Sequence, residues 1–278
     1  MGLISFTTLH RKLGIKRSDI VIDIGSGNNP ILRADILVEK YVFSDRERYS
    51  GLIMDRPVVS ADGARLPFRD KSIDFVHCSH VLEHVPDPAA FLDEIQRVGK
   101  RGIIVTPHGD YEKIDPRDQH LWYVWNQKER LILKQKTRWN EYREISKYFF
   151  NIIGNVREYW KLFDKYYELF NTIYLWEDKI DYEISGDSNF DFSLFNKASE
   201  ETTAEAGITL QVSSKAKLKS HFASAVRSAI SAPFNFNDLL CCPKCHSDLK
   251  KNSGLLACPV CQREFKSEGN LVIMNIET

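Results

Sequence analysis

The stretch Val21–Pro30, with the sequence VIDIGSGNNP, constrains the fold more than any other part of the chain. An apolar run that ends in an acid and two alternate glycines is typical of a buried strand that turns sharply beside a ligand. Gly25 and Gly27 lack a Cβ atom, so they permit positive φ angles and close approach of a ligand to the backbone. In open α/β sheets the ligand crevice lies off the carboxyl end of such a strand. The alternative is a tight strand-to-helix turn without a ligand.

The same stretch argues against a dinucleotide. The third glycine of the dinucleotide fingerprint is absent, and Asn28, Asn29 and Pro30 follow the second glycine instead. Asp23 would place a carboxylate beside the ligand, where an amino or sulfonium cation is favoured. The sequence therefore indicates a cationic ligand at this turn.

Three motifs in order carry a resemblance to class I S-adenosylmethionine-dependent methyltransferases. Residues 22–27 resemble the first motif of that family, and residues 60–68 (SADGARLPF) resemble its adenine-binding stretch. Residues 72–76 (SIDFV) and 81–88 (VLEHVPDP) resemble its fourth strand and the segment that follows. The resemblance spans residues 19–107. It implies an α/β, Rossmann-like fold with a mostly parallel seven-stranded sheet flanked by helices, and an enzyme that transfers a methyl group from S-adenosylmethionine.

The resemblance also implies which residues bind this cofactor. An acid at the end of the second strand would accept hydrogen bonds from the ribose hydroxyls; Glu39 fits this place best and Asp35 is the competitor. Asp62 would accept from the adenine amino group, unless it only caps a turn. The expected cofactor-binding residues are Asp23, Gly25, Ser26, Gly27, Glu39, Asp62, Gly63 and Ser79.

A hydroxyl acceptor would need a general base, and three histidines are candidates. His108 follows the fifth predicted strand and is the first choice, before His80 and His120. An unperturbed imidazole pKa near 6.5 suits this role. Most isolated histidines are structural or lie at the surface, which is the alternative for each. Glu83 and His84 are interpreted as helix-capping residues.

Hydrophobic patterns predict the remaining elements. The crossover after the first strand is near the minimum length, so its helix should be stunted. Residues 88–98 carry a helical apolar stripe. Residues 111–170 are rich in aromatic residues and predict a helical segment packed on the domain. The alternative is a cover over the active site that supplies the acceptor pocket. Residues 172–176 and 181–185 predict a final strand pair that closes the sheet.

The second constellation is a pair of Cys-x-x-Cys motifs near the C-terminus. Their spacing is typical of a tetrahedral structural zinc site without an open position. Two disulfides are the alternative, but they need an oxidising compartment. Residues 238–275 loosely resemble the small zinc-binding activator subunit of several methyltransferases, whose family pairs a strand with the enzyme's sheet. The expected zinc ligands are Cys242, Cys245, Cys258 and Cys261.

These patterns predict three parts of the chain. Residues 1–185 would form the methyltransferase domain, including the aromatic cover at about 111–170. Residues 186–237 would be a linker, with an amphipathic helix at 215–231 that docks on the protein or contacts a membrane surface or nucleic acid. Residues 238–278 would form the zinc ribbon, through which a protein partner could bind.

Composition and motifs limit the acceptor class and the cellular location that we expect. The chain has 38 basic and 38 acidic residues among 278, which gives no global electrostatic attraction for nucleic acid. No Asn-Pro-Pro-Tyr-type motif follows the fourth strand, which argues against methylation of base or glutamine amino groups. We therefore favour a small-molecule, lipid or glycan acceptor over RNA or a translation factor. A non-catalytic cofactor-binding or zinc-ribbon interaction protein is the other alternative. No apolar run is long enough to span a bilayer and no signal peptide is evident, so we expect a cytoplasmic protein.

Overall fold

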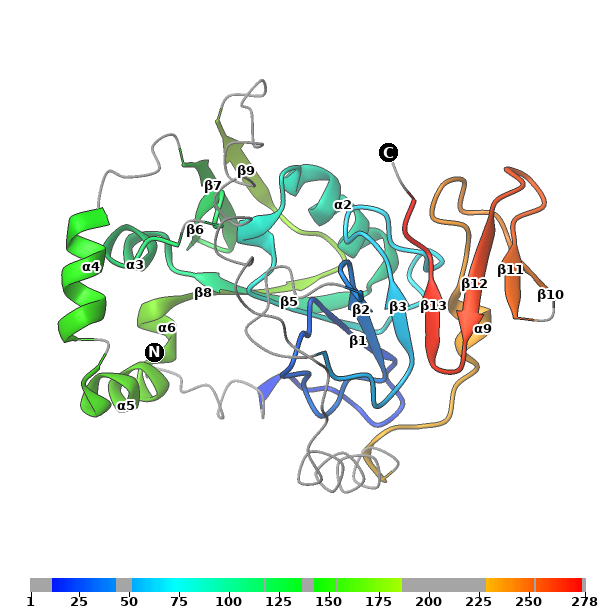
Figure 1. The fold of residues 1–278 in the computed structure, drawn as a ribbon, viewed down its shortest axis with the longest axis horizontal. Coiled ribbons are helices and arrows are strands. Elements are labelled where there is room, and N and C mark those ends of the chain that lie inside the picture. The colour runs from blue at the N-terminus through cyan, green and yellow to red at the C-terminus, as the bar shows by residue number, and fades with distance from the viewer. Residues whose placement is uncertain are drawn as a thin grey trace.

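A block of parallel strands forms the centre of the computed structural model. The structure describes residues 12–43, 52–117, 119–136, 143–153, 155–186, 229–252 and 254–276. The larger sheet in these residues has ten strands in the order β10-β11-β12-β13-β3-β2-β1-β4-β5-β8 (Figure 1). Its strands are β1 (Val21–Ile24), β2 (Ile36–Glu39), β3 (Val58–Ser60), β4 (Phe75–Ser79), β5 (Arg101–Pro107), β8 (Asn171–Glu177), β10 (Lys250–Asn252), β11 (Leu255–Ala257), β12 (Glu264–Glu268) and β13 (Leu271–Ile273).

The strands from β13 to β5 in this order are all parallel, and β8 is antiparallel to β5. The expected α/β fold with a mostly parallel sheet is therefore confirmed. The sheet is wider than the expected seven strands because the C-terminal module joins it. In Figure 1, β10 to β13 extend the sheet at one end, in orange and red.

The central strands are buried on both faces, as in parallel sheets covered by helices. One face packs against the apolar side of α2 (Pro88–Val98), whose Phe91, Leu92, Ile95 and Val98 are buried as the stripe predicted. Asp87 caps this helix by accepting a hydrogen bond from the Ala90 N–H at 3.0 Å. The other face packs against Leu13 and Tyr167. Because β1 to β4 are parallel, the loops that follow them lie at one edge of the sheet.

The crossover from β1 to β2 has turns but no helix, so the expected stunted helix is wrong. Eleven residues must leave one strand, turn and return to the next, which leaves no room for a helical turn with its caps. The Asp23 carboxylate instead accepts the Ile31 N–H at 2.9 Å and holds the crossover against the strand.

The remaining elements lie outside the large sheet. They are η1 (Leu82–His84, a 3₁₀ turn), α3 (Gly109–Ile114), β6 (Trp122–Gln127), β7 (Arg130–Gln135), α4 (Arg143–Ile152), α5 (Arg157–Lys165), α6 (Tyr167–Phe170), β9 (Tyr182–Ser185) and α9 (Phe236–Leu239). Strands β6, β7 and β9 form a separate sheet. The cover over residues 111–170 thus contains a hairpin as well as helices.

Two expectations about later segments have clear outcomes. Residues 171–177 form β8 within the large sheet, but residues 182–185 form β9, which pairs with β7. The expected final strand pair is therefore wrong. The predicted helix at 215–231 and most of the predicted linker lie outside the described residues. No helix in the described ranges has the length and apolar character needed to cross a bilayer.

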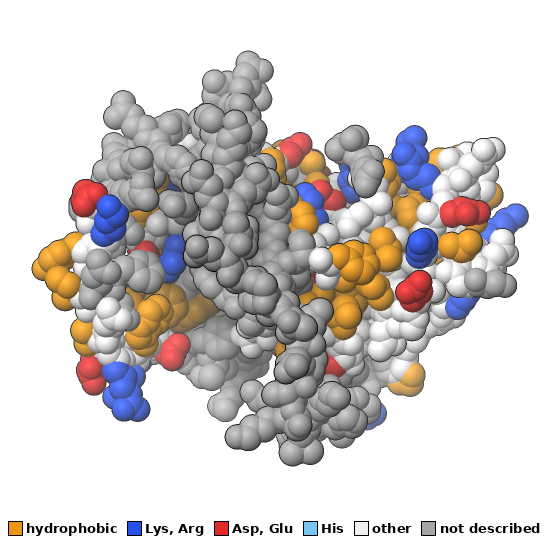
Figure 2. Space-filling model, viewed as in Figure 1, with side chains coloured by type: hydrophobic (Ala, Val, Ile, Leu, Met, Phe, Trp, Pro, Cys, Tyr) orange, Lys and Arg blue, Asp and Glu red, His pale blue; other side chains and the backbone are white. Residues whose placement is uncertain are grey.

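Exposed apolar side chains gather at the end of the molecule formed by α4 and α5. Tyr148, Ile152, Trp160 and Leu162 are all more than two-fifths exposed there. Figure 2 shows hydrophobic side chains at this end of the visible face. This surface lies at the opposite end of the molecule from β10 to β13 (Figure 1).

Candidate functional site

The carboxyl ends of β1, β2, β3 and β4 meet at one edge of the sheet. The register pairs Ile24 with Val38 and with Cys78, and Glu39 with Ser60. The residues that follow these strand ends therefore gather in one region. The fold thus brings together the glycine turn, Glu39, the Asp62–Gly63 pair and Ser79.

The glycine turn after β1 has the backbone that the sequence predicted. Gly25 and Gly27 have φ angles of 66° and 54°. A Cβ atom on Gly25 would lie 2.3 Å from the Val81 side chain, so this turn packs directly against the segment after β4. The turn is closed by the Gly25 N–H, which donates to the Val38 carbonyl at 2.8 Å.

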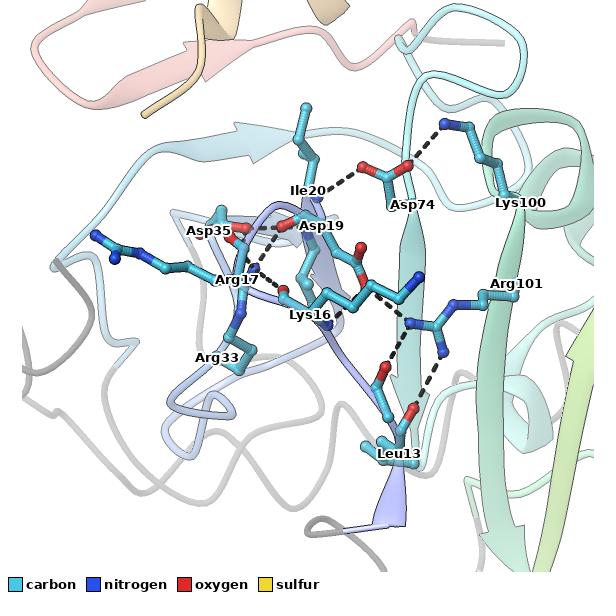
Figure 3. Close-up of polar contacts among 12 residues, drawn as sticks. Leu13, Lys16, Arg17, Asp19, Ile20, Arg33, Asp35, Asp74, Lys100 and Arg101 are labelled. Atoms are coloured by element: carbon cyan, nitrogen blue, oxygen red, sulfur yellow. Dashed lines mark hydrogen bonds and ion pairs between the residues drawn. The ribbon is translucent and has the colours of Figure 1, made fainter. Parts of the chain in front are cut away.

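Glu39 contacts the glycine turn from the end of β2. Its Oε1 accepts hydrogen bonds from the Ser26 hydroxyl at 2.8 Å and from the Gly27 N–H at 2.5 Å. Its competitor Asp35 precedes β2 and lies at the opposite edge, where it accepts from Val21 N–H and Arg33 (Figure 3). The position of Asp35 assigns it to an ion-pair network away from the turn.

Asp23 is buried, and both of its carboxylate oxygens are used inside the protein. Oδ1 lies 2.7 Å from His77 Nδ1, and Oδ2 accepts the Ile31 N–H at 2.9 Å. The carboxylate therefore orients the crossover that follows β1. No sequence motif points to His77, although it occupies the position that matches Asp23 on the neighbouring strand.

Asp62 follows β3 and pairs with a lysine. Its Oδ2 lies 2.8 Å from Lys40 Nζ, and its Oδ1 accepts the Ala64 N–H at 3.0 Å. Burial opposes ionisation, but these contacts and the Lys40 charge lower the pKa of the Asp62 carboxyl. Gly63 packs so closely on Phe91 that a Cβ atom would lie 2.3 Å from the ring.

A pocket adjoins Asp62 and includes the C-terminal segment. Its lining residues are Asp62, Ala64, Arg65, Asp87, Ala90, Met274 and Ile276. Residues from the end of the chain thus form part of the wall at the predicted adenine side of the site.

Ser79 ends β4 and is joined to the helical cover. It forms a side-chain hydrogen bond with Tyr167, and burial raises the pKa of that tyrosine to about 12. No sequence pattern singled out Tyr167, which begins α6. Its hydroxyl connects α6 to the strand end.

The three candidate histidines do not form one group. His80 follows β4 with a φ angle of 56°, and its Nδ1 lies 3.3 Å from Glu83 Oε1. His120 contacts the ring of His84, with centroids 4.7 Å apart. His108 caps α3 by accepting the Asp110 N–H at 3.3 Å. His80 and His120 therefore converge on η1, whereas the contacts of His108 lie in α3.

Glu83 and His84 are more than the capping residues that the sequence suggested. Glu83 is 1% exposed. Burial alone would raise its pKa, but His80, His84 and His120 lower the pKa to about 2. Burial lowers the pKa of His84 to about 4. A carboxylate and a neutral imidazole therefore lie side by side in η1 at neutral pH.

The four predicted zinc ligands lie together in the C-terminal module. Cys242 Sγ is 3.5 Å from Cys261 Sγ, and Cys245 Sγ is 3.4 Å from Cys258 Sγ. All four sulfur atoms lie within 4.8 Å of one another. Zinc–sulfur bonds of about 2.3 Å in a tetrahedron need sulfur separations of about 3.8 Å, so this arrangement fits a zinc ion.

A family described as "Methyltransferase domain" matches residues 37–106 by its sequence model. The matched segment runs from β2 to β5. It contains Glu39, Asp62, Gly63, Ser79 and Glu83. A comparison with curated proteins gave no match.

Several solved structures are similar to parts of the chain. The complex between the Haloferax volcanii Trm112 methyltransferase activator and a candidate methyltransferase has 22% identity over 36% of this chain and 51% of that chain, with a TM-score of 0.29. A SAM-dependent methyltransferase from Aquifex aeolicus has 17% identity over 37% and 64%, with a TM-score of 0.29. One from Mesorhizobium loti has 16% identity over 47% and 64%, with a TM-score of 0.31.

The chain spans about half the length of the Haloferax volcanii chain and of a similar structure from Bacillus halodurans. The family match over residues 37–106 and the geometry at the strand ends support a methyltransferase.

Proposed function

We propose that this chain, whose residues 37–106 match the methyltransferase domain family, transfers a methyl group from S-adenosylmethionine to a hydroxyl of a small-molecule, lipid or glycan acceptor. The observation that carries the proposal is the junction of Glu39 with the glycine turn at the strand ends. This junction brings an acid, backbone N–H groups and a close-approach turn to the carboxyl edge of the parallel strands. That edge is the usual ligand site of an open α/β sheet.

Each end of the cofactor has a proposed partner at this edge. Glu39 would accept hydrogen bonds from the ribose hydroxyls, and Asp62 would accept from the adenine amino group while the Gly63 N–H meets the ring. Ser26 and Gly27 would face the amino-acid part of the cofactor, with Gly25 allowing its approach. Ser79 would border the reacting end. Asp23 would act through the turn, because His77 and Ile31 already occupy its oxygens.

The proposed reaction needs alignment more than activation. The acceptor hydroxyl loses its proton to a base, and the oxygen lone pair attacks the methyl carbon. The carbon–sulfur bond breaks, its electron pair goes to sulfur, and S-adenosylhomocysteine leaves with the methylated acceptor. Orientation of the two reactants can lower the barrier by several kcal/mol, up to about 7–11.

His108 is the proposed base. It follows β5, next to the end of β4, because Ser79 pairs with Val105. Burial lowers the pKa of His108, so its imidazole is neutral and able to accept a proton at pH 7. His80 is the alternative at the neighbouring strand end, whereas His120 is already bonded to Glu112 through Nδ1 at 2.7 Å.

A structural zinc ion is proposed for the four cysteines.

RNA or a translation factor is the second acceptor class. The observation that favours this class is the parallel pairing of β13 with β3. A zinc ribbon that adds a strand to the sheet is what the resemblance to an activator subunit implies. Here the ribbon would act in cis.

Calorimetric titration with S-adenosylhomocysteine tests cofactor binding. We expect binding by the full chain and at least about tenfold weaker binding, or 1.4 kcal/mol, in Glu39→Gln and in Asp62→Asn. Asp74→Asn is the matched control, because Asp74 precedes β4 at the other edge of the sheet and pairs with Lys100 (Figure 3). A folded protein that gives no binding heat would disprove the proposal.

Transfer of a labelled methyl group then tests the acceptor. Small-molecule, lipid and glycan fractions are incubated beside RNA and protein fractions. Label in RNA or protein alone would replace the favoured acceptor with the second class. Cofactor binding with no transfer to any fraction would favour a non-catalytic role.

A further inference from the structure

A second cluster of metal-binding side chains lies apart from the four cysteines. Glu83 and His84 come from η1, and His120 comes from the segment before β6. One donor atom from each residue lies within 4.8 Å of the other two. We propose that Glu83, His84 and His120 bind a divalent transition-metal ion.

The Glu83 carboxylate is the first reason for a cation here. The side chain is 1% exposed. Among the residues that the structure describes, neither Glu83 oxygen has a hydrogen-bond partner. His80 Nδ1 comes to 3.3 Å of Oε1 without hydrogen-bond geometry. Burying a carboxylate whose oxygens accept no hydrogen bond is costly, and coordination of a cation would offset that cost.

The orientation of the two histidines is the second reason. His120 Nδ1 lies 2.7 Å from Glu112 Oε2, and Lys136 pairs with the other oxygen of Glu112. His84 Nδ1 lies 3.2 Å from the Gln119 carbonyl. Both contacts hold the proton on Nδ1 and leave Nε2 with its lone pair. A carboxylate or carbonyl behind the ring is the usual support of a metal-binding histidine.

Two imidazoles and one carboxylate select the kind of metal. Nitrogen donors suit zinc, iron, cobalt or nickel, whereas magnesium and calcium prefer oxygen ligands. Three protein ligands leave a coordination position open, as in catalytic zinc sites. This differs from the closed four-cysteine cluster, which has no position for a further ligand.

The cluster adjoins the proposed methyl-transfer site. Val81 precedes Glu83 by two residues, and its side chain fills the space beside Gly25 in the glycine turn. Ser79 lies at the start of the same segment. An acceptor oxygen bound at the open position would therefore lie near the strand ends. This use of the metal rests on the proposed function, whereas metal binding rests on the geometry alone.

Cobalt(II) titration of the full chain tests the site. Zinc is first measured by elemental analysis, and weakly bound metal is removed with a chelator while the four-cysteine site stays loaded. We expect one further equivalent of cobalt, seen by calorimetry and by visible absorption that lacks thiolate charge-transfer bands. Glu83→Gln and His120→Ala should weaken this binding at least about 100-fold. Glu112→Gln should weaken it about 10- to 100-fold, as for other residues that support metal ligands.

His108→Ala is the matched control, since its ring contacts lie in α3, and it should bind cobalt as the parent does. Glu83→Gln keeps the test valid if His120→Ala fails to fold. Metal-free Glu83→Gln should still fold, because the amide has nearly the shape of the carboxylate that it replaces. Added cobalt should then raise the unfolding temperature of the parent only.

Two results would overturn the metal site: cobalt binding that stops at the cysteine cluster, or a second equivalent that survives Glu83→Gln and His120→Ala. S-adenosylhomocysteine binding is measured on the same samples. Cofactor binding without the second metal would overturn this site alone. The second metal without cofactor binding would overturn the proposed function alone.

Discussion

Gly25 is glycine for two separable reasons. Its φ angle of 66° disfavours any side chain, and the space where a Cβ atom would lie is filled by Val81. Gly27 has a φ angle of 54° but open space around it. The pair therefore distinguishes backbone strain from steric overlap within one turn.

We predict that Gly25→Ala is more destabilising than Gly27→Ala. Gly27→Ala should lower the free energy of unfolding by about 1–2 kcal/mol, the cost of a left-handed backbone. Gly25→Ala should cost more, and Val81→Ala in the same chain should recover part of the excess. Denaturant unfolding at equilibrium measures all three. Equal costs for the two glycine variants would show that Val81 moves away freely.

The conformation and position of a single residue could be predicted from the sequence where they depend only on its own segment. The positive φ angles of the glycine turn and the choice of Glu39 over Asp35 follow from the position of each residue relative to a strand end. The buried cluster around Glu83 could not be predicted, because it includes His120, which is distant in the sequence. The Leu121 N–H donates to the Glu83 carbonyl at 2.6 Å, a contact that local patterns do not reveal.

Among the elements, the C-terminal segment after β13 connects the zinc ribbon to the site. The Asn275 side-chain amide donates to the Ser60 hydroxyl at 2.7 Å and to the Lys40 carbonyl at 3.0 Å. Lys40 in turn pairs with Asp62. A short segment of the ribbon module thus supports the predicted adenine side.

We predict that Asn275→Ala weakens S-adenosylhomocysteine binding about threefold to tenfold, which corresponds to the net contribution of one hydrogen bond, about 1 kcal/mol. Asn126→Ala is the control, because its side chain donates to the Ile173 carbonyl in β8, at the far edge of the large sheet. The control should leave the dissociation constant unchanged. Calorimetric titration measures the dissociation constant of both variants. An equal loss of affinity in the two would show that the segment after β13 has no specific effect on cofactor binding.

Some of the helices and strands could be predicted from the sequence pattern. Short apolar runs gave the central strands, and a capped apolar stripe gave α2. The hairpin β6–β7 was missed because Lys128 and Glu129, with φ angles of 53° and 64°, form its turn without the usual glycine or asparagine. The position of β9 beside β7 depends on packing far along the chain, which periodicity cannot supply.

In the whole molecule, one sheet runs from the ribbon through the site to β8. Strand β3 carries Asp62 at its end and is covered by β13. Arg69 adds a second connection, because it pairs with Asp248 and donates to the Asp238 carbonyl at 2.9 Å. Loss of the ribbon would leave β3 as an exposed edge, which favours association with other chains.

Zinc removal should therefore weaken cofactor binding at a distance. Small zinc modules depend on the metal for folding. We therefore predict that Cys258→Ser lowers the zinc content below one equivalent and exposes β3. S-adenosylhomocysteine binding should weaken at least about tenfold, or 1.4 kcal/mol. Cys241→Ala is the control, because Cys241 is buried beside the cluster without belonging to it. Elemental analysis, light scattering and calorimetry follow zinc content, association and affinity in both variants. Unchanged affinity in zinc-free Cys258→Ser would show that β3 and Asp62 keep their positions without the ribbon.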